Sequence, residues 1–298
     1  MIEHSIQTEA SCPLNTYLKR AFPAVSFVQW QMFMRKGFVR LNGKKTKGKE
    51  LVHSGDTLRI PPFLNMAEGA STTPVLSAKE AEWIRSLTLF ENDDFFVINK
   101  PSGIAVQGGS KTSKHLDGYL KALYPTNSPK IVHRLDKSTS GLILFAKNLE
   151  TAQNLTKLFE ERKIIKTYLA VCEGAPKKDV GTITTYIAKQ ACPGGERMMC
   201  VAKDGAEAIT NYKVMHKTST HSLIQYSPKT GRTHQLRVHS QYLGCPIVGD
   251  IKYGACEKGQ KLHLHAHKIH FMLKNEEFSF ETDMPDYMNL KILRSPII

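Results

Sequence analysis

Residue types and spacing that could support chemistry occur first in residues 131–147, which read IVHRLDKSTSGLILFAK. His133, Arg134 and Asp136 put an imidazole, a guanidinium and a carboxylate close together. A turn-prone Thr139-Ser140-Gly141 run and an apolar run follow, so we expect the polar cluster in a loop that leads into a buried strand. An arginine two positions from an aspartate is also typical of a weak surface ion pair, and that alternative stays open at this point.

Two later segments carry further reactive side chains. Residues 231–239 read GRTHQLRVH and contain Arg232, His234 and Arg237, while the strand-like run KTYLAV places Tyr168 in its middle. Spacing in the sequence does not by itself bring these segments together.

A histidine-rich run could instead indicate a metal centre. His263, His265 and His267 alternate, so a strand would place them on one face, with His270 on the other. Three imidazoles can bind zinc, but no Cys, Asp or Glu clusters with them. We therefore expect structural or solvent-facing histidines and predict no metal. No phosphate-loop spacing occurs either, and no cofactor is predicted.

The elements that must position these side chains read as strands with few helices. Helices are expected at 113–124 and 150–162. Strands are expected at 87–91, 95–100, 142–146, 166–171, 181–188, 206–215 and 222–227, with Asn92-Asp93-Asp94 as a hairpin turn. This pattern predicts an α+β fold with a mostly antiparallel sheet rather than βαβ units.

Composition is that of an ordinary globular chain, with 298 residues, 41% hydrophobic and 23% charged. That length predicts about two domains. There is no apolar run long enough for a membrane span, and the N-terminus does not read as a signal peptide. Six scattered cysteines without a C-x-x-C pair predict free thiols in a reducing cytoplasm.

The charge indicates a polyanionic partner. The net charge is +14, and residues 1–62 hold ten lysines and arginines against four acids. Such an excess favours nucleic acid through counterion release. An anionic membrane surface is the weaker alternative, because no basic amphipathic helix with a strong apolar face is evident.

The N-terminal part reads as a small module of two helices, a hairpin and a strand. A second helix from Ser26 to Lys36, an Asn42-Gly43 turn, a basic exposed segment at 44–49 and a strand at 57–60 are expected. We predict domains at 1–62 and 87–298, joined by a linker and a short helix at 63–86 that begins with the capping box Ser77-Ala-Lys-Glu80.

The segment RKGFVRLNGKKTKGKELVHSGDTLRI resembles an S4 RNA-binding domain. The resemblance implies that Arg35, Lys36 and Arg40 lie on the side that faces RNA. Residues that would contact phosphates are Lys44, Lys45 and Lys47, and such contacts position a protein without reading sequence.

Residues 100–103 (KPSG), 133–136 (HRLD) and 231–239 (GRTHQLRVH) together resemble the RluA-type family of RNA pseudouridine synthases. The resemblance spans residues 87 to about 282. With an S4-like domain ahead of GIAVQGGS, GERMMCVAKDGAEAITNYKV and LHLHAHKIHF, the chain is most similar to the RluC branch, which acts on large-subunit (23S) rRNA.

That resemblance implies a cofactor-free isomerisation of uridine to pseudouridine with Asp136 as the catalytic aspartate. Asp136 would attack the sugar, attack the base, or remove a sugar proton; the sequence leaves all three open. Arg237 would pair with Asp136 and Tyr168 would pack against the target base. Arg134 would enter the RNA stack, while Arg232 and His234 either contact RNA or brace the Asp136 loop.

Two rival functions are weighed against this one. A non-catalytic rRNA-binding or ribosome-assembly protein would use the same basic surface but would not need Asp136, Tyr168 and Arg237 together. A metal-dependent RNA hydrolase would rest on the histidine run alone. We expect RNA as the partner, no membrane association, a cytoplasmic location and a monomer.

Overall fold

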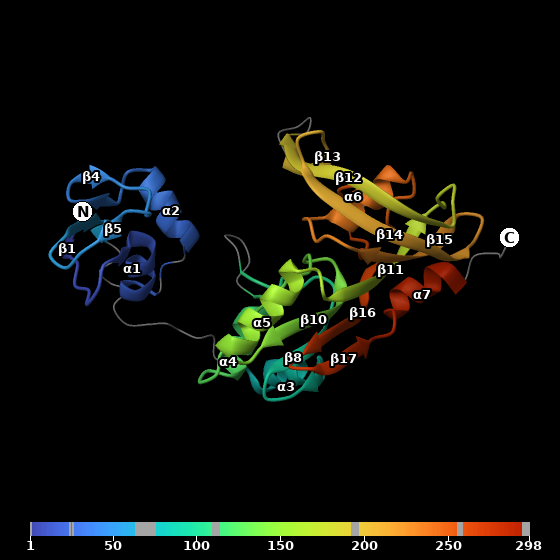
Figure 1. Ribbon diagram of the computed structural model, residues 1–298, viewed down its shortest axis with the longest axis horizontal. Helices are drawn as coiled ribbons and strands as arrows, with labels where there is room; N and C mark the ends of the chain where they lie inside the picture. Colours follow the sequence, from blue (N-terminus) through green and yellow to red (C-terminus); the bar gives the residue numbers. More distant parts are fainter. Residues whose placement is uncertain are drawn as a thin grey trace. The chain divides into compact units, whose positions relative to one another are not determined.

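The computed structural model describes residues 2–23, 25, 27–62, 76–108, 114–191, 197–254 and 259–293, and they form two compact units (Figure 1). The described residues up to Pro62 belong to the first unit, and those of the second begin at Leu76. Most of the expected linker, residues 63–75, lies outside the described residues. The predicted capping box is present, because Ser77 Oγ accepts from Glu80 N and starts α3 (Ala78–Ser86).

The first unit packs two helices against short strands. Its elements are β1 (Ile2–Ser5), β2 (Cys12–Pro13), α1 (Leu14–Ala21), α2 (Phe27–Arg35), β3 (Arg40–Leu41), β4 (Lys44–Lys45), β5 (Leu51–Val52) and β6 (Thr57–Ile60). Four strands form one sheet in the order β1-β6-β3-β4, in which β1 is a strand the sequence analysis does not predict. Asn42 and Gly43 have φ of 48° and 75°, which confirms the hairpin turn. Ser26, where the second helix is expected to begin, lies outside the described residues.

The second unit is built on one large sheet. Its strands are β7 (Thr88–Glu91), β8 (Phe95–Lys100), β9 (Lys130–Ile131), β10 (Ser140–Ala146), β11 (Ile165–Glu173), β12 (Val180–Ala191), β13 (Arg197–Val201), β14 (Ala206–Lys217), β15 (His221–Pro228), β16 (Leu264–Leu273) and β17 (Glu276–Glu281). The main order is β13-β12-β14-β15-β11-β16-β10-β8-β7. The pairing is antiparallel except between β10 and β16, as the predicted mostly antiparallel α+β fold requires.

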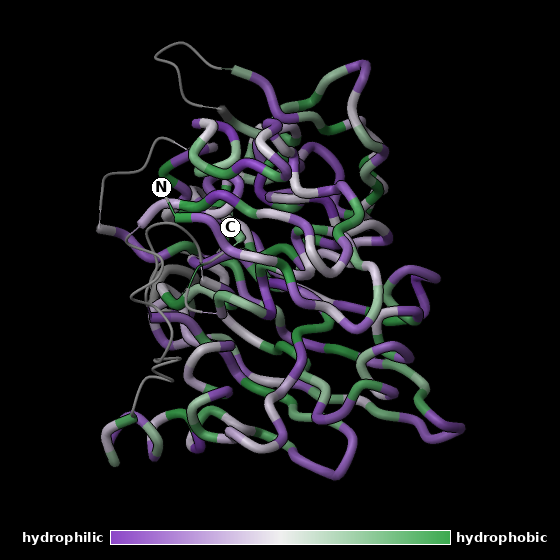
Figure 2. The backbone as a smooth tube through the Cα atoms, turned by 90° about the vertical axis from the view of Figure 1, so that its left-hand side faces the viewer, coloured by the Kyte–Doolittle hydropathy of each residue, from purple (hydrophilic) through white to green (hydrophobic). Residues whose placement is uncertain are grey.

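Helices cover this sheet and complete its core. They are α4 (Leu116–Leu123), α5 (Leu149–Glu160), α6 (Gln235–Tyr242) and α7 (Asp286–Leu293). All seven residues of β10 are buried, and α5 packs beside this strand (Figure 1). Hydrophilic colour marks many of the projecting turns in Figure 2. Because β10 at the centre of the sheet is fully buried, it is a rigid base for the loops at its ends.

The histidine run has structural roles, as expected. His263 and His265 are buried; the two ring nitrogens of His263 lie 2.9 and 3.0 Å from backbone carbonyl oxygens, and His265 Nδ1 meets Ser140 Oγ at 2.9 Å. His267 contacts Thr282 O and Glu281. Across the described residues, no group of three or more His, Cys, Asp or Glu side chains is placed to hold a metal ion.

Three of the described cysteines agree with the prediction of free thiols. Cys12, Cys172 and Cys245 are free thiols. Cys192 and Cys256 lie outside the described residues. No described helix is long and apolar enough to cross a membrane.

Candidate active site

Asp136 lies in the loop between β9 and β10, and the KPSG segment (residues 100–103) forms hydrogen bonds to this loop. Lys137 O accepts hydrogen bonds from Gly103 N at 2.9 Å and from Lys100 Nζ at 3.3 Å. Ser102 Oγ donates to Ser138 O at 2.7 Å. Because three donors from one segment hold two successive carbonyls, the backbone next to Asp136 is fixed.

Lys100 is fully buried, and no carboxylate of the described residues lies within 4.0 Å of its Nζ. Its Nζ also donates to Pro101 O and Ile104 O, at 3.1 and 3.0 Å. Burial lowers the pKa of Lys100 to about 7, and the negative charge of Asp136 opposes this shift. The sequence analysis uses Lys100 only as part of a motif and gives it no role in the site.

The Thr139-Ser140-Gly141 turn brings the Asp136 loop against β16. Gly141 has φ of 106° and lies opposite Ala266 in the parallel β10–β16 pair. A Cβ at this position would overlap the carbonyl oxygen of Ala266 and stand 2.6 Å from its nitrogen. Only glycine permits both this conformation and this close approach.

Arg237 is buried on α6 between two carboxylates. Its Nε and Nη2 donate to Asp250 Oδ2 and Oδ1, each at 2.7 Å, while its Nη1 lies 3.7 Å from Asp136 Oδ2. The ion pair implied between Arg237 and Asp136 is therefore present, but Asp250 is the closer partner. Asp250 is not predicted from the sequence, because nothing in the spacing of a Gly-Asp pair after a helix shows that this aspartate binds Arg237.

His234 and Tyr253 complete the surroundings of the carboxylate. His234 Nε2 lies 3.7 Å from Asp136 Oδ2, and its Nδ1 shares a 2.8 Å hydrogen bond with Tyr253 Oη. The Tyr253 ring also faces the Arg237 guanidinium, 4.9 Å from its centroid. Burial lowers the pKa of His234 despite the attraction of Asp136, so its imidazole is neutral at neutral pH.

Tyr168 approaches the site from β11. A register shift between Thr167 and Tyr168 interrupts the pairing of β11 with β16 at this point. Burial, and then the charge of Asp136, raise the pKa of Tyr168 above its ordinary value. Its phenol therefore stays protonated through the neutral pH range.

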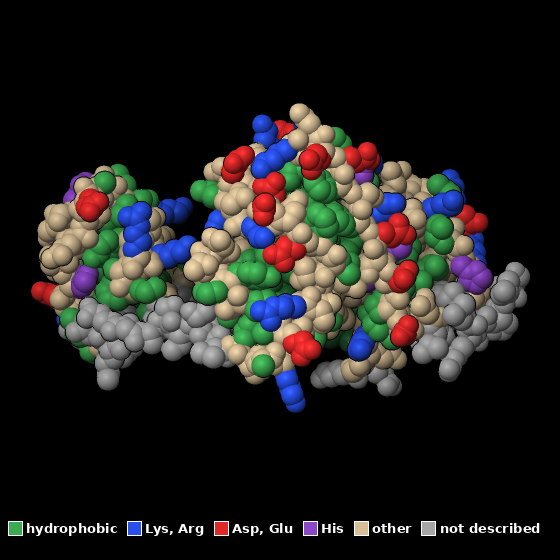
Figure 3. Space-filling view, turned by 90° about the horizontal axis from the view of Figure 1, so that it is seen from below, with side chains coloured by type: hydrophobic (Ala, Val, Ile, Leu, Met, Phe, Trp, Pro, Cys, Tyr) green, Lys and Arg blue, Asp and Glu red, His purple; other side chains and the backbone are tan. Residues whose placement is uncertain are grey.

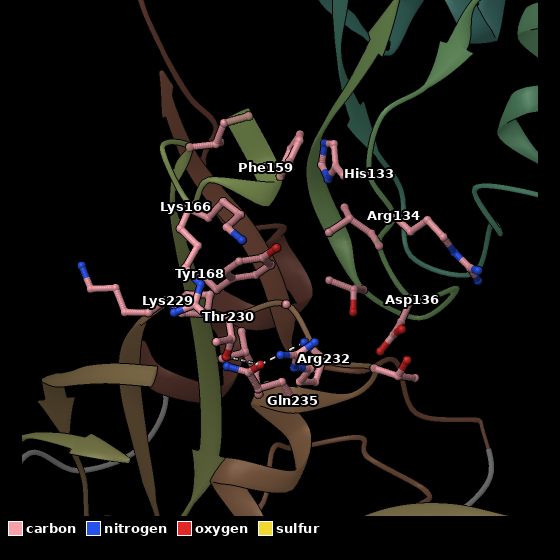
Figure 4. A pocket seen from close by; sticks show the side chains of 18 of the residues that line it. His133, Arg134, Asp136, Phe159, Lys166, Tyr168, Lys229, Thr230, Arg232 and Gln235 are labelled. Atoms are coloured by element: carbon pink, nitrogen blue, oxygen red, sulfur yellow. Dashed lines mark hydrogen bonds between the residues drawn. The ribbon is translucent and has the colours of Figure 1, made fainter. Parts of the chain in front are cut away.

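These side chains line one cavity of about 670 Å³, which brings together the six site residues predicted in the second unit: Arg134, Asp136, Tyr168, Arg232, His234 and Arg237 (Figure 4). Asp136 is 30% exposed toward this space, whereas Arg237 is only 7% exposed. The site thus presents the Asp136 carboxylate beside a fixed guanidinium, that of Arg237, and a protonated phenol, that of Tyr168.

The two arginines predicted to meet RNA lie at the edge of this cavity. Arg134 is exposed, and its side chain extends away from Asp136 and Tyr168 (Figure 4). Within the described chain no ion pair joins Arg134 to Asp136, so the surface-pair alternative is wrong. Arg232 is exposed and its Nε donates to Glu207 O at 2.9 Å.

The six residues predicted to contact RNA from the first unit lie mostly on its surface. Five are exposed: Arg35, Lys36, Lys44, Lys45 and Lys47. Arg40 is half-buried, and its Nη1 donates to Gly43 O at 3.2 Å. The prediction that residues 44–49 are exposed throughout is wrong at Thr46 and Gly48, which are buried. The Thr46 hydroxyl donates to Glu50 within the turn.

The chain is similar to several known proteins. The family model for RNA pseudouridylate synthase matches residues 94–242, a span that includes Asp136, Tyr168 and Arg237. Ribosomal large subunit pseudouridine synthase C of Rickettsia prowazekii is 36% identical over 291 residues, covering 94% of this chain and 96% of that relative. The protein of the same name from Escherichia coli is 35% identical over 255 residues, covering 85% and 80%.

A solved structure shows the same fold. Human RNA pseudouridylate synthase domain containing 4 superposes with a TM-score of 0.63 at 25% sequence identity, covering 74% of this chain and 99% of that chain.

Proposed function

The chain belongs to the RluA-type family of RNA pseudouridine synthases, and on that premise we propose that it converts specific uridines of large-subunit (23S) rRNA to pseudouridine. Two observations support the proposal. Relatives named for the large ribosomal subunit match most of the chain. The observation that carries it is the partly exposed carboxylate of Asp136, held beside Arg237 and Tyr168 in one cavity.

The reaction is an isomerisation in which nothing is gained or lost. The C–N glycosidic bond of a uridine breaks, the base turns, and a C–C bond forms to the same sugar. Glycoside hydrolases use two carboxylates because a leaving oxygen needs a proton and water must be activated. Here the base stays in the pocket, so one carboxylate, Asp136, suffices without a cofactor.

We assign Arg237 the task of orienting Asp136 without neutralising it fully. Two guanidinium nitrogens are committed to Asp250, and the third is 3.7 Å from Asp136. The Asp136 carboxylate is thus held by charge but keeps its exposed oxygen for the reacting nucleotide.

Tyr168 and Arg134 are assigned to the RNA. The protonated phenol of Tyr168 would lie against the target base, where it can exchange a proton with the ring. Extruding a base costs a few kcal/mol of stacking. The exposed guanidinium of Arg134 would fill the vacated stack and offset part of that cost. His234 is assigned to bracing Asp136, from which it stands 3.7 Å, rather than to binding RNA.

The first unit is assigned to RNA binding as an S4-like domain, and the boundaries 1–62, 63–86 and 87–298 are proposed for the chain. Its exposed basic residues around the β3–β4 hairpin support this assignment. We further propose that the protein is a cytoplasmic monomer.

Mapping pseudouridines in rRNA from cells with and without the gene tests the function. We expect specific sites in large-subunit rRNA to revert to uridine when the gene is absent, and to return when it is restored. Identical maps, together with a defect in ribosome assembly, would favour the non-catalytic assembly protein instead.

A further inference from the structure

One side of the cavity is built from groups that the proposed chemistry at Asp136 does not use. It comprises Phe159, Arg162, Lys166 and Lys229, which we call the Lys166 arm. In Figure 4, Lys166, Tyr168 and Lys229 lie on one side of the pocket, and Arg134 and Asp136 lie on the other.

The strands place this arm next to the position assigned to the base. Lys166 precedes Tyr168 by two residues on β11. Tyr168 pairs with Tyr226 on β15, so the antiparallel register carries the end of β15, and Lys229 just beyond it, toward Lys166. Groups that follow one another along two neighbouring strands can contact successive parts of one bound strand.

The wall of the arm is a fixed stack. The His133 ring lies on the Phe159 ring with centroids 4.5 Å apart, and Lys166 Nζ is 5.8 Å from the Phe159 centroid. His133 Nε2 accepts a hydrogen bond from Leu144 N at 2.9 Å. Burial, and then Lys166, lower the pKa of His133 to about 3. The imidazole is therefore neutral, and it anchors the stack without adding charge.

The cations of the arm are not paired with a carboxylate in the described part of the chain. Among the described residues, no carboxylate lies within 4.0 Å of Arg162, Lys166 or Lys229. Nearby Glu161 is instead paired with Lys157 and Lys163. On the face drawn in Figure 3, by contrast, many lysines and arginines of the second unit lie interspersed with acids.

The carboxylates that line this cavity are Asp136, already paired with Arg237, and the exposed Glu160. Lys166 is partly buried, and burial lowers its pKa. A partly buried ammonium without a counter-ion is unfavourable, so the arm would gain from a bound anion.

We propose that the Lys166 arm binds the RNA phosphodiester that adjoins the target uridine, with Lys166 as the principal ligand and Lys229 and Arg162 beside it. The inference rests on the proposed function, since it takes Tyr168 as the neighbour of the target base. A phosphodiester carries a permanent negative charge and flanks every nucleotide in the strand, so it is the anion that must accompany a base entering this cavity. The contact fixes the strand while Asp136 acts.

The test pairs a protein charge with an RNA charge. The probe is a fragment of 23S rRNA that spans a modified uridine, made with native phosphates or with one neutral methylphosphonate on either side of that uridine. For the wild-type protein we expect one of the two substitutions to weaken binding about ten-fold, the order expected for a charge-assisted contact. Lys166→Met should weaken binding of the native fragment by a similar factor and should no longer respond to that substitution.

Salt dependence and a matched control complete the design. The slope of log Kd against log salt should fall by about one for Lys166→Met and stay unchanged for Lys166→Arg. Lys213→Met removes an exposed charge from β14, outside the cavity, and should change Kd little. Thermal melting checks that each variant is folded, and Lys229→Met, an exposed position, provides a second variant with the same predicted direction.

The proposal is overturned if Lys166→Met binds the native fragment as tightly as the wild-type protein, or if it keeps the full response to the methylphosphonate. A wild-type protein that binds this RNA but forms no pseudouridine contradicts the proposed function instead. The Kd values and salt slopes still decide the Lys166 contact in that case.

Discussion

At the scale of single residues, the site depends on how one arginine is divided between two carboxylates. Asp250 is 1% exposed, accepts two hydrogen bonds from Arg237, and also accepts from Lys252 N and Tyr253 N. Its orientation is therefore fixed by the backbone. Asp250 in turn fixes the orientation of the Arg237 guanidinium, and Arg237 orients Asp136. We therefore expect Asp250 to control the rate although it does not contact the reacting nucleotide.

Replacing Asp250 tests this dependence. Asp250→Asn keeps the shape but removes one acceptor and the charge, so Arg237 should lose its fixed direction toward Asp136. We expect kcat to fall about a hundred-fold with little change in RNA Kd, the order of loss expected when a reacting group is misplaced by about 1 Å. Single-turnover kinetics and RNA titration measure the two quantities.

Tyr253→Phe is the matched control for that experiment. It removes only the hydroxyl that meets His234 Nδ1 and keeps the ring against Arg237. Its kcat should fall much less than that of Asp250→Asn. Equal losses in the two variants would mean that Arg237 is not oriented by Asp250.

Lys100 makes stability depend on pH. Its pKa is about 7 in the folded protein, against 10.5 for an unperturbed lysine. Between these values the unfolded chain holds a proton that the folded chain has released, so a rise in pH favours the folded state.

The free energy of unfolding of the wild-type protein, minus that of Lys100→Met, should therefore rise between pH 7 and 10. The one-proton limit on this rise is about 1.4 kcal/mol per pH unit. Urea titrations of both proteins across this range measure it. Parallel pH profiles would show that Lys100 keeps its proton in the folded state.

At the scale of elements, apolar runs and turn signals predict most strands, because a buried strand needs an uninterrupted hydrophobic stretch. The span of β10 and the Asn42-Gly43 hairpin follow from such local rules. Helix α6 does not. His234 starts it in the left-handed region, with φ of 56°, and a non-glycine residue there leaves no recognisable start signal in GRTHQLRVH. The parallel pairing of β10 with β16 cannot be predicted from local sequence either, because the paired residues are more than a hundred positions apart.

The start of β10 offers a test at this scale. Gly141→Ala should destabilise the second unit by about 3 kcal/mol or more, since the Cβ adds an overlap with Ala266 to the backbone strain. Gly103→Ala is the matched control, because Gly103 also has positive φ, at 95°, but has nothing within 4 Å of the added Cβ. It should cost about 1 to 2 kcal/mol. Denaturant unfolding measures both, and equal losses would show that the approach to β16 is not what requires glycine.

At the scale of the whole molecule, charge and motif spacing predict an RNA partner and the residues that share a cavity. What they cannot supply is the set of buried partners, because Lys100, Asp250 and Tyr253 act through contacts that only the folded chain creates. The division into two compact units also lets the proposed RNA binding of the first unit and the proposed chemistry of the second be tested separately.

Removing residues 1–62 tests that separation. The remaining chain should stay folded, because its core clusters contain none of the removed residues. Its affinity for 23S rRNA should fall and the dependence of Kd on salt should become shallower, since the removed segment carries ten lysines and arginines against four acids. Equal binding by the full and shortened proteins at every salt concentration would contradict the assignment of the first unit to RNA.

The central claim is that Asp136 performs the chemistry, and pseudouridine formation by Asp136→Asn tests it most directly. The amide keeps the shape of the side chain but cannot ionise, attack or remove a proton. We predict that turnover on 23S rRNA falls by at least about a thousand-fold while RNA affinity stays close to that of the wild-type protein. Pseudouridine formation at a rate near that of the wild-type protein would contradict the account.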